Sequence, residues 1–424
     1  MRRHRAAERV LAAALLLLSA ACGSRLPERD FEQGPSPTAA SAPLRIGIIT
    51  SITSPVGGAA FTGTRDGAQA YFRQVDAQGG IAGRPVEVLT CDDGGSPLGN
   101  TECVHRLVAE KKVFALVATT ALAYAGAPQV SRAGVPDIGG QPIGPAYDTY
   151  PHLYGIYGSQ APRTGTPGWD GELYGGTEIY RYFKQTQGAR TAAVVSYNQA
   201  ASAAYARLIT QGLRKEGYEV VPEQVDFALP NFRAVAADLR ERGADLVFDA
   251  LDTHGNAQLC EAMDAVGARV TAKVTNVQNW TDSVPADYRD SPHCRNALWV
   301  TGSSRNYDET TDPQVRAFRA ALHGKPLSQW QLEGWAAAMW FTDAARSCAA
   351  DLTRACVERF VGRPEPYTAR GLLLPVRYEQ LARPPATRRT CLSVARWRDG
   401  TGWVTRSGPM DTNCFTVPQL PYRP

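Results

Sequence analysis

The sequence predicts an α/β fold built from two lobes, each with a parallel β-sheet that is covered by helices. Short apolar segments alternate with segments of helical periodicity, and this alternation occurs twice along the chain. Alternating strands and helices form parallel sheets with helices on both faces. Residues 147–167, which are rich in proline, glycine and tyrosine, separate the two series and are predicted to form a crossover between the lobes.

The first series begins with a strand over residues 44–50 and a helix over residues 63–78. Gly79 and Gly80 end this helix, because glycine readily adopts the left-handed conformation that closes a helix C-terminus. The other predicted elements of this series are strand 86–91, helix 100–110, strand 114–118, helix 124–133 and a strand that opens at 134–138.

The second series repeats the alternation. Its predicted elements are strand 191–195, helix 203–216, strand 219–225, helix 232–242, strand 245–250 and helix 256–266. Open α/β sheets bind ligands beyond the carboxyl ends of their strands, so two facing lobes predict a cleft for a small molecule. Helices over 312–322 and 329–346 are expected to return to the first lobe.

The N-terminus has the layout of a secretory signal peptide over residues 1–21, with arginines at its start and a short apolar core. The segment Ser19-Ala-Ala-Cys22 resembles the bacterial lipobox, in which the cysteine is lipidated; a plain signal peptide cleaved nearby is the alternative. Residues 22–41 have the composition of a flexible tether. The expected location is the extracytoplasmic face of the cell membrane, with the lipid anchor as the only membrane contact.

Cysteine usage agrees with export. Of nine cysteines, eight remain when Cys22 is set aside, and an even number in an exported chain predicts disulfides. A metal site is the competing explanation, but no C-x-x-C motif occurs and the histidines are isolated, so neither a metal nor a cofactor is expected. Joining sequence neighbours is the simplest pairing, and it gives Cys91–Cys103, Cys260–Cys294, Cys348–Cys356 and Cys391–Cys414.

Charge and motifs exclude two broad classes of function. The formal net charge is +4, of which the first 21 residues supply +3, so the rest of the chain lacks the basic footprint of a nucleic-acid-binding protein. The sequence contains no G-x-S-x-G, P-loop or H-E-x-x-H motif, and Gly47 is not followed by the glycines of a dinucleotide-binding loop. An enzyme is therefore not expected.

Several segments, taken together and in order, resemble the branched-chain amino-acid-binding family, which comprises type I periplasmic binding proteins that feed ABC importers. The resemblance covers residues 44–332. Its segments are Arg45-Ile-Gly-Ile-Ile49, Thr64-Arg-Asp-Gly-Ala-Gln-Ala70, residues 75–86, Cys91-Asp-Asp93, Ala133-Gly-Val-Pro136, Leu246-Val-Phe248 and Ala265-Val-Gly267. It implies a monomer whose lobes are joined by a three-strand hinge: a first lobe of residues 42–157 plus 306–345, and a second of residues 158–305 plus 346–424.

The resemblance also suggests ligand-binding residues. Serine and threonine in strand-end loops can equally be N-cap residues, and an aspartate in such a loop can simply be solvated. No acidic residue occurs over 275–280, where the amino-acid binders place a glutamate for the ammonium group, so leucine, isoleucine and valine are not expected as ligands. The candidate ligand-binding residues are Ser54, Phe61, Thr119, Thr120 and Gln141 in the first lobe, and Tyr197 and Asp252 in the second.

The expected function is capture of a small polar molecule, amino-acid-like or a small carboxylate, and its delivery to the permease subunits of an ABC importer. The alternative is a lipoprotein that senses the same ligand and signals to a receptor or cell-envelope partner, because one cleft serves both tasks. Permease genes beside this gene would favour transport.

Overall fold

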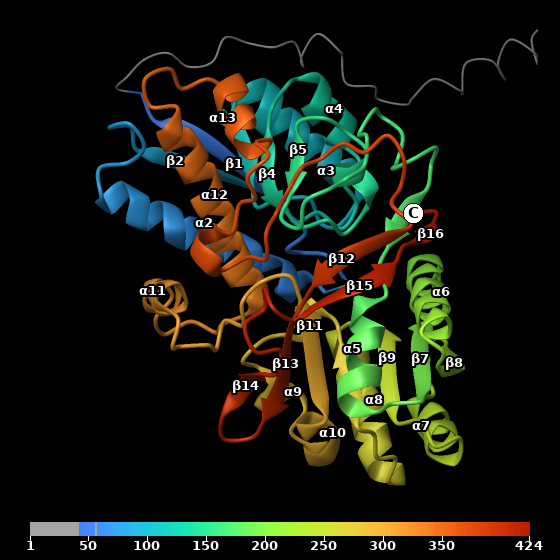
Figure 1. Cartoon of the computed structure of the whole chain (residues 1–424). Coiled ribbons are helices and arrows are strands. Elements are labelled where there is room, and N and C mark those ends of the chain that lie inside the picture. Colours follow the sequence, from blue (N-terminus) through green and yellow to red (C-terminus); the bar gives the residue numbers. More distant parts are fainter. Residues whose placement is uncertain (1–41, 56) are drawn as a thin grey trace, which may run out of the picture.

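The computed structural model describes residues 42–55 and 57–424; the predicted signal peptide, lipobox and tether lie outside them. Two α/β lobes, each built around its own sheet, lie one above the other in Figure 1. The predicted two-lobed fold with parallel sheets is thereby confirmed.

The first lobe contains a five-stranded, fully parallel sheet of order β2-β1-β3-β4-β5. β1 is almost wholly buried, because its isoleucines face helices on both sides of the sheet. The strands are β1 (Leu44–Thr50), β2 (Val86–Asp92), β3 (Ala115–Val117), β4 (Asp137–Gly140) and β5 (Leu153–Gly155). The helices are α2 (Gly58–Ala77), α3 (Pro97–Val104), η2 (His105–Glu110), α4 (Ala127–Arg132) and η3 (Pro145–Asp148).

The second lobe contains a seven-stranded sheet of order β14-β13-β11-β10-β9-β7-β8. β13 and β14 come from the C-terminal tail and are antiparallel to their neighbours. The strands are β7 (Thr191–Tyr197), β8 (Glu219–Val225), β9 (Leu246–Ala250), β10 (Ala272–Thr275), β11 (Leu298–Gly302), β13 (Ser393–Arg398) and β14 (Gly402–Thr405). The helices are α5 (Glu178–Gln187), α6 (Ala200–Lys215), α7 (Phe232–Glu241), α8 (Thr253–Val266), η4 (Val277–Asn279), α9 (Val284–Asp287) and α10 (Pro292–Asn296).

Two later helices, α11 (Pro313–Ala321) and α12 (Gln329–Ser347), pack on the first lobe as expected from the sequence. α12 lies unusually close to α2, because both helices carry glycine at the contact. A Cβ added at Gly67 would lie 1.8 Å from the Gln331 carbonyl oxygen, and one added at Gly334 would lie 1.9 Å from the Thr64 carbonyl oxygen. The aromatic side chains of α12 are buried in the core.

The tail after α12 contributes to both lobes. Helix α13 (Arg354–Val361) lies on the first lobe, since the Arg354 guanidinium donates to the carbonyl oxygens of Val113 and Phe114, each at 2.9 Å. The sequence had assigned all of residues 346–424 to the second lobe, and that assignment is wrong for α13; the other lobe boundaries stay predictions. Short bridges join Ser159 to Tyr378 and Ser304 to Leu373, so the three crossovers between the lobes lie side by side.

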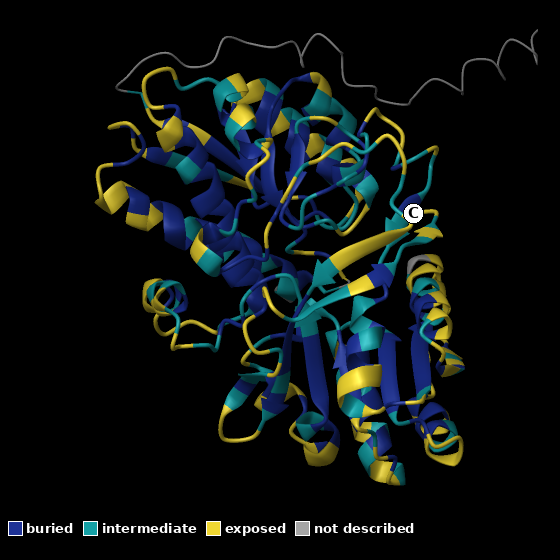
Figure 2. Ribbon diagram, in the orientation of Figure 1, coloured by how far each residue is buried: buried dark blue, intermediate teal, exposed yellow. Residues whose placement is uncertain are grey.

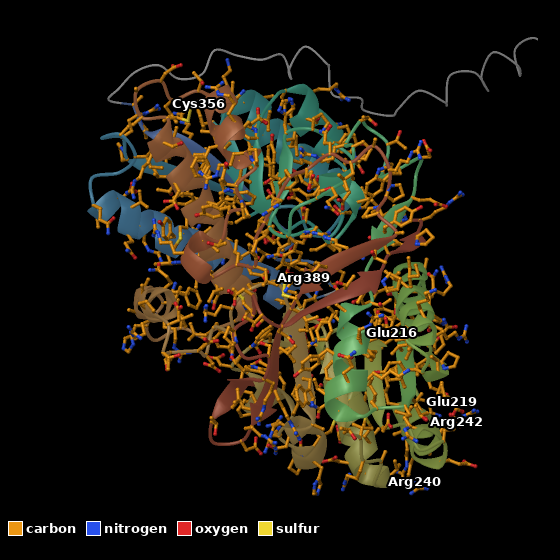
Figure 3. All side chains as sticks on the ribbon, viewed as in Figure 1. Glu216, Glu219, Arg240, Arg242, Cys356 and Arg389 are labelled. Atoms are coloured by element: carbon orange, nitrogen blue, oxygen red, sulfur yellow. A yellow bond between two sulfur atoms is a disulfide. The ribbon has the colours of Figure 1, made fainter. Side chains whose placement is uncertain are left out.

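A two-stranded ribbon, β12 (Thr387–Cys391) with β15 (Cys414–Pro418), lies between the lobes in Figure 1. The final strand β16 (Leu420–Tyr422) pairs with β6 (Leu173–Gly175), which belongs to the first crossover. Figure 3 marks the ribbon by Arg389, next to the disulfide that closes it.

The eight described cysteines form the four neighbour pairs that the sequence suggested. Three of these disulfides join elements of the same lobe: β2 to the next element α3, α8 to α10, and the end of α12 to the next element α13, where Figure 3 labels Cys356. The fourth disulfide joins Cys391 to Cys414, the two ends of the segment that carries β13 and β14. It therefore fixes the tail at the point where the tail joins the second sheet.

Burial follows the layered architecture. Figure 2 shows the central strands of both sheets buried, while edge strands such as β8 and the outer faces of the surrounding helices are partly exposed. None of the helices within residues 42–55 and 57–424 is both long and apolar enough to span a bilayer.

Candidate functional site

The strand-end loops of the first lobe are tied together by buried hydrogen bonds. The Ser51 hydroxyl donates to Asp93 at 2.6 Å and accepts from the backbone N–H of Leu122 at 2.9 Å, which connects the loops after β1, β2 and β3. Asp93 also accepts from the Asn100 amide at 2.9 Å. These loops therefore form one rigid wall at the carboxyl edge of the sheet.

The predicted first-lobe residues lie in or beside this wall and are mostly buried. Ser54 is 8% exposed, Thr119 is 1% exposed and Thr120 is inaccessible. The Thr120 hydroxyl donates to the carbonyl oxygen of Ala118 at 3.2 Å, and Ala118 has a positive φ of 56°. A left-handed alanine at a strand end is strained, and such strain persists where the surrounding structure over-determines it.

Phe61 and Gln141 contact α12. The Phe61 ring stacks on Trp330 with centroids 5.4 Å apart. The Gln141 amide donates to a carboxyl oxygen of Glu333 at 2.6 Å. In this conformation Gln141 thus binds the protein itself, and the sequence analysis did not anticipate its partner.

Glu333 is a fully buried carboxyl group that joins the first lobe to the crossovers. Besides Gln141, it accepts hydrogen bonds from Tyr157 at 3.1 Å, at the start of the first crossover, and from Ser304 at 2.6 Å, in the second. Burial raises the pKa of Glu333, while these hydrogen bonds lower it. Because Glu333 accepts hydrogen bonds from both crossovers, it fixes the geometry of two of the three connections between the lobes.

The two predicted second-lobe residues contact each other. The Tyr197 hydroxyl donates to an Asp252 carboxyl oxygen at 2.9 Å, and the same oxygen accepts from the Gly255 backbone N–H at 2.8 Å. Asp252 is therefore the N-cap of α8. Burial and the neighbouring carboxylate raise the pKa of Tyr197, so its hydroxyl stays protonated as a donor.

Beneath Asp252 lies a buried ion pair that the sequence analysis missed. The Lys273 ammonium group pairs with Asp249, and both side chains are inaccessible to solvent. The ammonium group also donates to the side-chain Oδ1 of Asn256 at 2.5 Å, and Asp249 accepts from the Leu251 backbone N–H at 3.1 Å. This network holds the loop after β9, which carries Asp252.

A cavity of about 570 Å³ lies between the lobes. Its first-lobe wall is formed by the N-termini of α2 and α12, and its second-lobe wall by the loops that follow β9 and β10. Of the seven predicted ligand-binding residues, Asp252 lines this cavity and Phe61 packs on Trp330, which lines it. The other five lie outside the lining, and their contact with a ligand stays a prediction.

The charged groups of this cavity are unevenly distributed. Among the described residues that line it, none is a lysine or an arginine, whereas Asp252, Asp282 and Asp287 contribute carboxyl groups. Gly57 and Gly58 bring the N-terminus of α2 to the opposite wall, and no side chain caps that helix. The cavity therefore has a positive helix end on one side and carboxylates on the other.

A second buried carboxyl group lies behind the loops of the first lobe. Asp137 accepts hydrogen bonds from the hydroxyl groups of Tyr124 at 2.7 Å and Tyr147 at 3.0 Å. Burial raises the pKa of Asp137 from 3.8 to about 6, although these hydrogen bonds oppose the effect.

We expect Asp137→Asn to reduce the pH dependence of stability. The folded state binds the Asp137 proton more tightly than the unfolded state, so the free energy of unfolding falls as the pH rises from 3.8 to about 6. This loss amounts to about 3 kcal/mol at most, and asparagine cannot titrate. Urea unfolding across this pH window measures the slope, with the exposed Asp290→Asn as control. An unchanged slope in Asp137→Asn would refute the assignment.

Two lobes whose strand-end loops and helix N-termini face one shared cavity define a solute-binding protein. The chain belongs to the periplasmic binding protein family, whose model matches residues 43–400. Proteins of this family bind solutes rather than catalyse reactions, and they act outside the cytoplasm. Among curated proteins, none matches this chain.

Solved structures show the same fold. A fatty acid ABC transporter substrate-binding protein from Thermomonospora curvata is 14% identical with a TM-score of 0.66, over 93% of this chain and 95% of that one. An R. palustris solute-binding protein in complex with benzoate is 15% identical with a TM-score of 0.63, over 89% and 97%. The protein LivJ from Streptococcus pneumoniae, in complex with isoleucine, is 15% identical with a TM-score of 0.65, over 86% and 100%. At such low identity these similarities support the fold alone.

Proposed function

We propose that this protein is a lipid-anchored, extracytoplasmic solute-binding protein that captures a small polar molecule between its lobes and delivers it to an ABC importer. The observation that supports this function most directly is the cavity of about 570 Å³ whose walls come from both lobes. Small-molecule sites typically have volumes of about 300–1,000 Å³. The similar structures include substrate-binding proteins of ABC transporters, which makes a permease the favoured partner.

The charges around the cavity favour an amino-acid-like ligand over a small carboxylate. The uncapped N-terminus of the 20-residue helix α2 offers backbone N–H groups and a positive dipole end to a carboxylate. On the opposite wall, Asp252, Asp282 and Asp287 favour an ammonium group. A zwitterion satisfies both walls, whereas a simple carboxylate would face the three aspartates without compensation.

Capture is proposed to proceed by closure of the lobes. Ligand contacts to both lobes favour the closed state only by the difference in affinity between the closed and open states. A permease could then recognise the closed form as the loaded one. The residues proposed to hold the ligand are Ser54, Phe61, Thr119, Thr120 and Gln141 on the first lobe, with Tyr197 and Asp252 closing over it from the second.

We expect Asp252→Asn to weaken ligand binding about 5- to 150-fold, the effect of losing one charged contact. Asparagine is as good an N-cap as aspartate, so α8 and the melting temperature should be nearly unchanged. Native mass spectrometry of protein purified without refolding identifies the ligand, and titration calorimetry with that ligand measures its affinity. Small-angle scattering of the wild type should show compaction when the ligand is added.

The matched control is Asp290→Asn, because Asp290 is on the same lobe and its side chain is 74% exposed. It should bind the ligand with wild-type affinity. Tight binding without compaction, and without any effect of Asp252→Asn, would place the ligand elsewhere and contradict the proposed cleft.

We expect Cys22→Ala to release the protein from the membrane fraction. Cys22 lies outside the described residues, and the prediction rests on the lipobox-like segment that precedes it. Stable anchoring requires acyl chains, which contribute about 0.8 kcal/mol per buried methylene, and the variant cannot carry them. Fractionation followed by immunoblotting is the measurement. A variant that remains membrane-bound would contradict the single-anchor hypothesis.

A further inference from the structure

The second lobe contains another cavity, of about 260 Å³, on the face of its sheet that α5 covers. It shares no lining residue with the cavity between the lobes. β11 and β13 form its floor, and Arg406, which follows β14, lies at its edge. Its lining consists of Tyr182, Thr186, Gln187, Trp299, Arg396, Arg398 and Arg406.

Strand register brings the three arginines to one face of the sheet. Arg396 and Arg398 are two residues apart in β13, so their side chains point to the same side. Arg396 is directly opposite Trp299 of β11. Arg406 follows β14, and its backbone N–H donates to the Val394 carbonyl oxygen. This bond continues the pairing of β14 with β13, so the Arg406 side chain is on the same face of the sheet as that of Arg396.

The positive charge in this cavity is not neutralised. No acidic residue is among its described lining. The Arg396 guanidinium donates to the carbonyl oxygen of Asn296 at 2.9 and 3.0 Å, a neutral partner. Burial lowers the pKa of Arg396, and the charges of Arg398 and Arg406 lower it further. Arg295 on the same lobe differs, because it forms an ion pair with Asp399 at 2.6 Å.

An unsatisfied donor belongs to the same cavity. Trp299 is 2% exposed, and within the described part of the chain its indole N–H has no hydrogen-bond partner. A buried donor without an acceptor is unfavourable by about 1–3 kcal/mol. A bound anion would supply an acceptor near this donor and would separate the three like charges.

We infer that this cavity is an anion site that takes a phosphate group. Guanidinium groups match phosphate oxygens in pairs of parallel hydrogen bonds, and three of them suit a group with several charged oxygens better than a single carboxylate. Two sources share this chemistry: free inorganic phosphate and the headgroup of an anionic phospholipid. The inference does not depend on the ligand of the cleft.

The first arm of the test titrates the protein with inorganic phosphate by calorimetry, at low ionic strength so that salt does not screen the site. We expect Arg398→Gln and Arg406→Gln each to weaken binding about tenfold or more. Arg396 is left intact, because its bonds to Asn296 are structural. The control is Arg289→Gln, whose side chain is 78% exposed on the same lobe.

The second arm measures sedimentation of the Cys22→Ala chain with vesicles of phosphatidylglycerol or of phosphatidylcholine. Phosphate binding that both arginine variants weaken identifies a soluble anion as the ligand. Binding to phosphatidylglycerol alone, with the same dependence on Arg398 and Arg406, identifies the lipid headgroup. If neither probe binds, or if Arg289→Gln has the same effect as the site variants, the proposed anion site is wrong.

Discussion

Replacing Lys273 by methionine should lower the free energy of unfolding by about 3–5 kcal/mol, the usual effect of breaking a buried ion pair from one side. The substitution leaves Asp249 charged in a position with no solvent access. It also removes the donor that binds the side-chain Oδ1 of Asn256. Urea unfolding followed by circular dichroism measures the loss, and the loop that carries Asp252 should be the first part to become mobile.

A double variant separates the destabilisation caused by the unpaired charge of Asp249 from that caused by the changed packing at position 273. In Lys273→Met combined with Asp249→Asn no charge remains, and the introduced amide can still accept the bond from Leu251, so more than half of the lost stability should return. Such recovery marks an interaction between the two residues rather than two separate effects. Equal losses in the single and the double variant would mean that the charge of Asp249 is not what destabilises the single variant.

Where the hydrophobic pattern is strong, the sequence predicted the elements closely. The strand predicted over 44–50 is β1, and the helix predicted over 329–346 is α12, which ends one residue later. α2 was predicted to begin at residue 63 but begins at Gly58. Its first turn contains glycine and alanine, which carry no amphipathic signal and which the sequence reading therefore left in the loop.

The tail was harder to predict, because its partners are distant in sequence. β13 has charged and apolar residues in alternation, yet its pairing with β11 joins residues that are about a hundred positions apart. α13 is fixed to the first lobe by Arg354, whose acceptors Val113 and Phe114 lie more than two hundred residues earlier. No local pattern contains such information.

In the candidate site, topology predicted which loops form the walls, but it did not predict the hydrogen-bond partners of the individual side chains. Asp252 and Tyr197 were expected to act together, and they share a hydrogen bond. Lys273 and Glu333 gave a signal that went unused: Lys273 is the single charged residue of β10, and Glu333 is the single charged residue of α12 before Asp343. A charged side chain is almost never fully buried without a partner, so a charge inside an apolar segment predicts a buried partner.

Replacing Glu333 by alanine should lower the free energy of unfolding by about 3–4 kcal/mol. Three buried donors, from Gln141, Tyr157 and Ser304, would lose their acceptor, and an unsatisfied buried donor costs about 1–3 kcal/mol. The cavity left by the side chain adds to the loss. Tyr157 and Ser304 belong to different crossovers, so the variant should hold the angle between the lobes less firmly. The difference in radius of gyration between the open and closed forms, measured by small-angle scattering, should therefore be smaller than in the wild type.

Glu333→Gln and Glu365→Ala are the matched comparisons. Glutamine keeps the volume and one carbonyl acceptor and removes a charge that burial disfavours, so its loss should be less than half of that in Glu333→Ala. Glu365 is exposed on the surface, and its removal should change the free energy of unfolding by less than about 0.5 kcal/mol. If Glu333→Ala unfolds at the urea concentration of the wild type, Glu333 does not hold the crossovers. Closure would then depend on backbone contacts such as the bridge between Ser304 and Leu373.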